Sequence, residues 1–98
     1  MDPNTSNAAV VQELYEVITD RKKNPVEGSY TNYLFSKGID KILKKIGEES
    51  VEVVISSLSG EKSAIIYEIA DLQYHLMVLM AEKDITPEDI YNELKKRR

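Results

Sequence analysis

Apolar residues recur at helical spacing along most of the chain. The first such segment covers residues 7–23 and ends before Asn24-Pro25, a pair that discourages a helix from continuing. Its apolar positions are Val10, Val11, Leu14, Tyr15, Val17 and Ile18. This pattern predicts an amphipathic helix, followed by a polar connection over residues 24–28.

Capping and breaking residues divide the remainder of the chain. Ser29 is a suitable N-cap for a short helix that Gly38 interrupts, and Thr86 with Pro87 predicts the start of a final helix through about Lys96. Between them, two long helices are expected at about 39–58 and 61–82, with a break at Ser59-Gly60 that favours antiparallel pairing. No segment alternates as a strand does. The sequence therefore predicts an all-α bundle of four to five helices.

The helix expected at 39–58 is apolar on two sides of a charged stripe. A broad face contains Ile39, Ile42, Leu43, Ile46, Val53 and Val54, and a smaller strip contains Val51, Ile55 and Leu58. A lone surface helix needs only one buried face, so the strip predicts a second partner, either another helix of the chain or a neighbouring subunit. In the helix at 61–82 we expect the core face to hold Ile65, Ile69, Leu72, Leu76, Leu79 and Met80, widened by Ile66 and Met77.

Composition limits the classes of protein that fit. A length of 98 residues with 42% hydrophobic residues predicts a single domain over 1–98, in which we expect residues 1–6 to be flexible. Cysteine is absent, which excludes disulfides, thiolate metal sites and cysteine nucleophiles. The net charge of -4 argues against a nucleic-acid partner. Uninterrupted apolar runs are far shorter than the roughly 20 residues of a membrane span, so we expect a soluble cytoplasmic protein without a membrane partner.

Carboxylates gather at two places on the long helices. Glu48, Glu49 and Glu52 lie within two turns of the first, and Glu68 and Asp71 lie one turn apart on the second. Antiparallel pairing would bring both groups to one cleft, where four anions repel by several kcal/mol unless protonated, solvated or neutralised. Oxygen ligands favour Mg²⁺ or Mn²⁺. The alternative left open is that these are ordinary solvent-facing carboxylates.

Lysines adjoin the acidic residues and suggest a phosphorylated substrate. Lys37, Lys41, Lys44 and Lys45 suit a polyphosphate chain, although a charge run is commonly only a solvated face. Metal-bound carboxylates beside lysines suit cleavage of a phosphoanhydride, and no Gly-rich phosphate loop is present. His75, one turn after Asp71, is a ligand, a proton donor or simply a partner of that carboxylate.

These residues resemble the phosphoribosyl-ATP pyrophosphohydrolases of histidine biosynthesis, within the MazG-like all-α nucleoside triphosphate pyrophosphatases. The similarity covers about residues 8–98. The superfamily pattern EExxE followed by ExxD is matched, and SYT with KxxxKxGEE indicates the particular family. The matching positions are Gly28, Ser29, Tyr30, Thr31, Leu34, Gly38, Lys41, Lys45, Gly47, Glu48, Glu49, Glu52, Glu68, Ala70, Asp71, Leu72, Tyr74, His75, Leu94 and Arg97.

The resemblance implies hydrolysis of phosphoribosyl-ATP to phosphoribosyl-AMP and pyrophosphate with Mg²⁺. Its implied metal ligands are Glu49, Glu52, Glu68 and Asp71, with Glu48 as a further ligand or the base that orients water. Lys41 and Lys45 would contact phosphates, and Ser29, Tyr30 and Thr31 match a segment expected to bind substrate. It also implies a homodimer and, because zinc-binding cysteines are lacking, a separate cyclohydrolase protein.

Two alternatives to this function stay open. A MazG-like pyrophosphatase of different substrate range would share the acidic pattern. A non-enzymatic helical dimerisation module would share the apolar strips while its glutamates remained ordinary surface residues.

Overall fold

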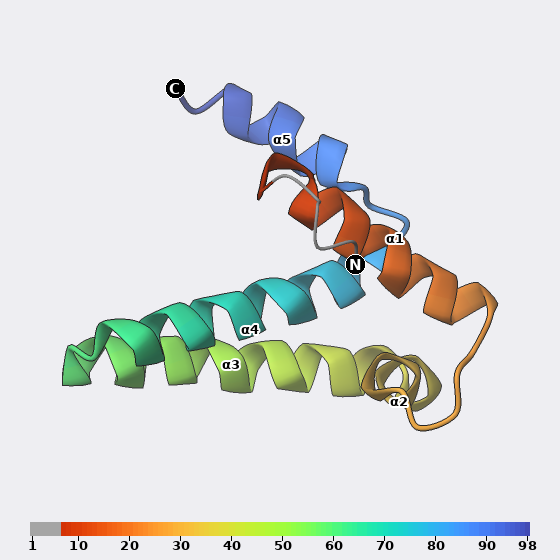
Figure 1. The fold of residues 1–98 in the computed structure, drawn as a ribbon, viewed down its shortest axis with the longest axis horizontal. Helices are drawn as coiled ribbons and strands as arrows, with labels where there is room; N and C mark the ends of the chain where they lie inside the picture. Colours follow the sequence, from red (N-terminus) through yellow and green to blue (C-terminus); the bar gives the residue numbers. More distant parts are fainter. Residues whose placement is uncertain (1–6) are drawn as a thin grey trace.

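A computed structural model describes residues 7–98, and over that range the chain is built from helices (Figure 1). The elements are the 3-10 turn η1 (Asn7–Ala9), α1 (Val10–Lys23), α2 (Tyr30–Lys37), α3 (Ile39–Ser59), α4 (Lys62–Glu82) and α5 (Pro87–Lys95). The predicted all-α class and both long helices are confirmed within one residue of their expected bounds. The expected flexibility of residues 1–6 concerns residues outside this range.

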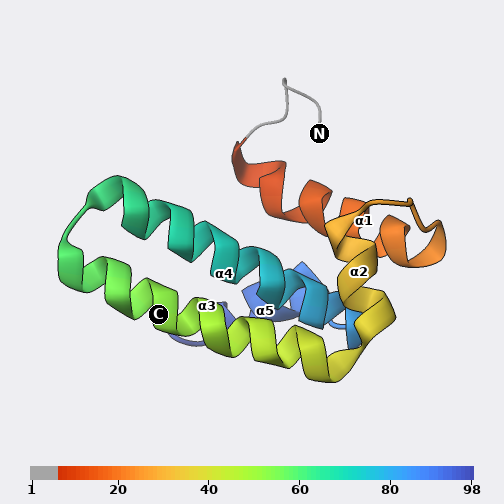
Figure 2. The same ribbon diagram turned by 90° about the horizontal axis from the view of Figure 1, so that it is seen from below.

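The helices α3 and α4 form an antiparallel hairpin and lie side by side along its length in both views (Figures 1 and 2). Gly60 ends α3 in the left-handed conformation, with φ 80° and ψ 2°, and its N–H donates to the carbonyl of Ser56 at 3.3 Å. A residue with a Cβ atom would be strained in this conformation, so glycine permits the tight reversal. This short turn brings the faces of the two helices together.

Side-chain caps fix the starts of α2 and α5. Ser29 Oγ accepts the N–H of Asn32 at 3.2 Å, as its predicted N-cap role requires. Thr86 and Asp89 form a reciprocal capping box, with bonds of 2.9 and 3.2 Å. Asn32 also fastens the preceding loop, because its side chain accepts from the N–H of Val26 and donates to the carbonyl of Arg21. The α1–α2 connection is thereby held against α2.

The buried core lies at one end of the hairpin, where α1 and α2 cover it. Its apolar members are Ile18, Leu34, Ile42, Met77, Val78 and Ala81. The predicted core face of the second long helix is only partly right, because Ile66, Ile69 and Leu76 are exposed, while Met77 is buried as expected and Val78 is buried although it was not expected to be. Ile66 and Ile69 lie in the half of α4 that is paired with α3 alone (Figure 2), and Leu76 lines an open groove beside α5.

The far half of the hairpin exposes an apolar surface, which we call the hairpin face. It comprises Val51, Val54, Ile55 and Leu58 of α3 and Ile66, Tyr67 and Ile69 of α4. Leu58 is 84% exposed. The second apolar strip expected on α3 is therefore real and is left uncovered by the described helices. Exposed apolar residues gathered on two adjacent helices are typical of a surface that packs against a partner.

Among the helices of residues 7–98, one, α4, is long and apolar enough to cross a membrane by length and composition alone, with a mean hydropathy of 1.2 over its most apolar window. A central helix of a bundle meets the same criteria. Two carboxylates, Glu68 and Asp71, lie in the middle of α4, where each would cost about 3 kcal/mol in a bilayer. In this structure α4 contacts three other helices, and its residues Met77, Val78 and Ala81 belong to the core formed with them.

Candidate active site

The hairpin brings the two predicted acidic groups together. Ligand atoms of Glu49, Asp71 and His75 lie within 4.8 Å of one another. Glu49 comes from α3 and is only 8% exposed, whereas the other two residues project from α4. A buried carboxylate facing a second one requires a neutralising partner. The predicted meeting of Glu49 with Asp71 is therefore present in the structure.

Glu52 and Glu68 extend the site toward the hairpin tip. Partial burial, the charges of Glu49 and Glu52 and a hydrogen bond with Glu49 raise the pKa of Glu68 above its ordinary value. After burial, the causes of this raised pKa are two residues of α3, so the carboxylates of both helices lie close enough to interact. We call Glu49, Glu52, Glu68 and Asp71 the acidic cluster.

Lys45 is the cation nearest to this cluster. Its Nζ lies 3.4 Å from Glu49 and 3.9 Å from Glu48, one helical turn along α3. Burial lowers the pKa of Lys45, but Tyr30, Glu49 and Glu48 outweigh that effect and raise the pKa above its ordinary value. The ammonium group therefore stays charged at neutral pH. It compensates part of the negative charge of the cluster.

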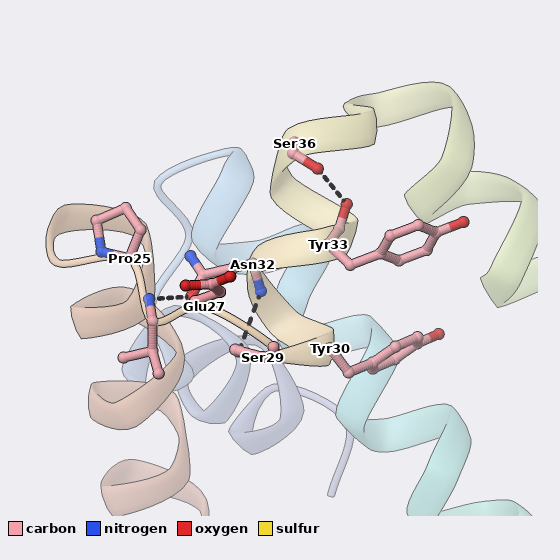
Figure 3. A pocket seen from close by; sticks show the side chains of 9 residues that line it. Pro25, Glu27, Ser29, Tyr30, Asn32, Tyr33 and Ser36 are labelled. Atoms are coloured by element: carbon pink, nitrogen blue, oxygen red, sulfur yellow. Dashed lines mark hydrogen bonds between the residues drawn. The ribbon is translucent and has the colours of Figure 1, made fainter.

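Two tyrosines at the start of α2 form an aromatic wall beside Lys45. The rings of Tyr30 and Tyr33 are stacked, with centroids 6.1 Å apart and planes 23° apart, and they point in the same direction (Figure 3). The ammonium groups of Lys37 and Lys41 lie 5.8 and 5.9 Å from the centre of the Tyr33 ring. This arrangement places cations and aromatic faces together, as nucleotide recognition requires.

An open hollow of about 770 Å³ lies along the other side of these tyrosines (Figure 3). It is lined by Pro25, Val26, Glu27, Gly28, Ser29, Tyr30, Asn32, Tyr33 and Ser36. The walls come from the α1–α2 connection that Asn32 fastens and from the first turns of α2. Its size suits a small organic molecule.

The three residues of the SYT segment have different surroundings. Ser29 caps α2 while lining the hollow, and the buried Thr31 is hydrogen-bonded to the hydroxyl of Tyr74. Tyr30 alone reaches the acidic site, since its hydroxyl oxygen lies 2.8 Å from Nε2 of His75. Of the three residues, Tyr30 therefore contacts the acidic site, whereas Ser29 and Thr31 bond groups that hold the start of α2 in place.

Two residues at the site were given no role from the sequence: Tyr74 was named only as a position matching the family, and Asn32 was not named. Tyr74 packs against His75 and bonds Thr31, and Asn32 secures the loop that borders the hollow. The position of Tyr74 directly before His75 was a usable signal. A single asparagine after a helix cap offers none, because its partners, Arg21 and Val26, lie in the preceding helix and loop.

Fold and site together define a class: a helical protein in which an antiparallel helix pair joins carboxylates from both helices beside lysines, as in proteins that bind a hard cation and a phosphate. Residues 11–98 match the family described as phosphoribosyl-ATP pyrophosphohydrolase. The chain belongs to this family. Its matched region contains the acidic cluster, both lysines and the SYT segment.

Relatives of two lengths support this membership. A phosphoribosyl-ATP pyrophosphatase of Clostridium novyi is 58% identical over 92 residues, which are 94% of this chain and 84% of that protein. The histidine biosynthesis bifunctional protein HisIE of Caldanaerobacter subterraneus is 66% identical over 88 residues, which are 90% of this chain and 43% of that protein. The chain thus spans less than half of the bifunctional relatives but most of the shorter ones.

The raised pKa of Glu68 predicts a stabilising substitution. In the pH range between the ordinary carboxyl pKa and the raised one, the folded protein binds more protons than the unfolded chain, so its stability rises as pH falls. We therefore expect Glu68→Gln to raise the melting temperature of the metal-free protein at pH 7, with a smaller gain at pH 4. Calorimetry at both pH values measures this, with Glu27→Gln in the exposed loop as control. An equal gain from both variants, or a loss from Glu68→Gln, would contradict it.

Proposed function

We propose that the chain hydrolyses phosphoribosyl-ATP to phosphoribosyl-AMP and pyrophosphate, the second step of histidine biosynthesis. The observation that carries the proposal is the meeting of Glu49 with Asp71 across α3 and α4, beside the ammonium group of Lys45. Membership of the phosphoribosyl-ATP pyrophosphohydrolase family supports the choice of substrate. A cytoplasmic location fits a biosynthetic enzyme of this kind.

The acidic cluster suits a hard divalent cation. All four residues offer carboxylate oxygens, the ligand type that Mg²⁺ and Mn²⁺ prefer. Burial and the charges of Glu49 and Glu52 raise the pKa of Glu68, and Lys45 beside Glu49 offers a single positive charge to four carboxyl groups. We propose Glu49, Glu52, Glu68 and Asp71 as the ligands of Mg²⁺. When bound, the ion neutralises phosphate charge and makes water a stronger nucleophile.

The remaining proposed roles follow from position. Lys45 and Lys41 bind the phosphate oxygens, because Lys45 borders the cluster and Lys41 lies one turn away over Tyr33. Glu48 is half exposed, lies beside Lys45 and orients the attacking water or adds a ligand. Tyr30 contributes its ring to substrate binding, and Ser29 and Thr31 keep the start of α2 in place for it.

The chain is also proposed to act as a homodimer. The hairpin face exposes seven large apolar residues on two adjacent helices, and a second copy would bury them. These 98 residues contain no cysteine, and we therefore do not propose cyclohydrolase activity for them.

Substrate specificity is tested with a nucleotide panel. Purified protein is incubated with phosphoribosyl-ATP, dUTP and ordinary nucleoside triphosphates, with and without Mg²⁺, and pyrophosphate is measured. We expect release from phosphoribosyl-ATP alone, and only with the ion. Turnover of the other nucleotides instead would indicate a pyrophosphatase of different range. No turnover of any compound would favour a non-enzymatic dimerisation module.

Removing one charge of the acidic cluster tests the ligand assignment. We expect Glu52→Gln and Asp71→Asn each to lower kcat/KM for phosphoribosyl-ATP by at least about 100-fold, because each removes a ligand from the ion. The metal-free melting temperature should not fall, since each change relieves repulsion between carboxylates. Glu93→Gln, on the exposed side of α5, is the matched control. Retained activity, or a large loss of metal-free stability, would refute the ligand role.

The dimer proposal predicts a change in mass. Sedimentation equilibrium of the wild type should give twice 11.2 kDa over a dilution series. Leu58→Glu places a charge in the hairpin face and should yield a monomer, because a buried unpaired charge costs several kcal/mol. Ser57→Glu, the adjacent position on α3, should leave the dimer intact. A monomeric wild type would overturn this part of the proposal.

A further inference from the structure

His75 has both ring nitrogens in hydrogen bonds. It is the only histidine of the chain and is 2% exposed. Its Nδ1 lies 2.8 Å from the backbone carbonyl oxygen of Asp71, and its Nε2 lies 2.8 Å from the hydroxyl oxygen of Tyr30. A carbonyl oxygen only accepts, so Nδ1 carries the hydrogen, and in a neutral ring Nε2 then accepts the hydroxyl hydrogen of Tyr30.

The imidazole is also held by the rings around it. Tyr30 and Tyr74 meet it edge to face, with centroids 5.7 and 5.2 Å away and planes at 79° and 88°. Tyr74 is in turn bonded to Thr31 on α2. Two residues of α4 are thus linked to two successive residues at the start of α2. A ring in these surroundings has one orientation.

We propose that His75 is a positioning residue that holds the ring of Tyr30 beside the acidic cluster, and that it is not a metal ligand. The nearness of His75 to Glu49 and Asp71 suggests coordination, but either nitrogen would first have to give up a hydrogen bond. Coordination through Nε2 would break the hydrogen bond that Nε2 accepts from Tyr30. Coordination through Nδ1 would require the hydrogen to move to Nε2, which is the other tautomer. The cluster already supplies oxygen ligands, so the imidazole serves a different purpose.

The bond to His75 also positions the aromatic wall of Tyr30 and Tyr33. The Tyr30 hydroxyl is committed to His75 and its ring stacks on both Tyr33 and Tyr74, while Tyr30 and Tyr33 remain 44% and 41% exposed at the edge of the hollow. An aromatic face next to a phosphate site binds the base of a nucleotide by stacking. We therefore assign the adenine ring of the substrate to the aromatic wall of Tyr30 and Tyr33, which His75 holds in place through Tyr30. This assignment rests on the proposed function, whereas the bonding of His75 does not.

The tautomer is measured without substrate. The ring nitrogens of a single histidine give one unambiguous set of signals in a long-range proton–nitrogen NMR spectrum. We expect the pattern of a hydrogen on Nδ1 and a bare, hydrogen-bonded Nε2, unchanged when Mg²⁺ shifts the backbone amides of Glu49 and Asp71. A hydrogen on Nε2, or a displacement of either ring nitrogen to a coordinated value, would overturn the proposal.

Paired variants test the positioning role. An asparagine amide reaches the place of Nδ1 and a glutamine amide that of Nε2, so His75→Asn loses the bond to Tyr30 and His75→Gln retains an acceptor for it. We expect His75→Asn and Tyr30→Phe each to raise KM for phosphoribosyl-ATP by about five- to tenfold, the worth of one hydrogen bond. His75→Gln should recover most of that loss. The kcat value and the affinity for Mn²⁺ should change by less than about twofold.

The double variant separates positioning from independent effects. Because His75→Asn and Tyr30→Phe remove the same bond, together they should raise KM no further than either alone. Multiplied effects, a tenfold loss of Mn²⁺ affinity, or a fall in kcat at constant KM would overturn the proposal. Tyr30→Phe leaves the buried imidazole in place and covers the case in which His75→Asn fails to fold. A wild type without activity on phosphoribosyl-ATP refutes the proposed function alone, because the tautomer measurement still decides the bonding of His75.

Discussion

Packing α3 against α4 forces like charges together, and the rest of the site accommodates that constraint. Glu49 is buried opposite Asp71, and burial together with the charges of the two glutamates across the hairpin raises the pKa of Glu68. An apolar pair of helices would be more stable at these positions. The arrangement is maintained by apolar packing at Ile42 and Val78 nearby and is relieved in part by Lys45. A site held under electrostatic strain in this way is ready to gain stability from a cation.

The sequence was informative wherever a local rule decides the structure. Gly60 requires a left-handed turn, and Ser29 and Thr86 cap their helices through bonds to residues three positions away. The acidic residues were found because their spacing places them on one side of each helix, and because so short a turn leaves antiparallel pairing as the simple solution. Fold class and acidic cluster therefore followed from patterns within single helices.

Features that depend on distant neighbours could not be found in this way. The bond between Tyr30 and His75 joins positions 45 residues apart, and no local pattern distinguishes Tyr30 from Tyr33 as its donor. Glu49 is buried while Glu48, its neighbour on the same helix, is exposed, which depends on where α4 lies. Val78 joins the core of α4 and Ile69 is excluded from it for a similar reason, since α1 and α2 cover one end of the hairpin and leave the other open.

The position of Gly60 gives the hairpin a mirror symmetry along the sequence. Glu52 precedes Gly60 by eight residues and Glu68 follows it by eight, while Glu49 and Asp71 are each eleven residues away. Eleven residues are close to three helical turns. The segments of α3 and α4 between the acidic residues and Gly60 can therefore be lengthened or shortened by equal whole turns, and the acidic residues of the two helices would still face each other. An unmatched insertion of one residue would turn one set by about 100°. The half of the hairpin that carries the hairpin face can thus change in length, while the acidic residues of the two helices stay opposite each other.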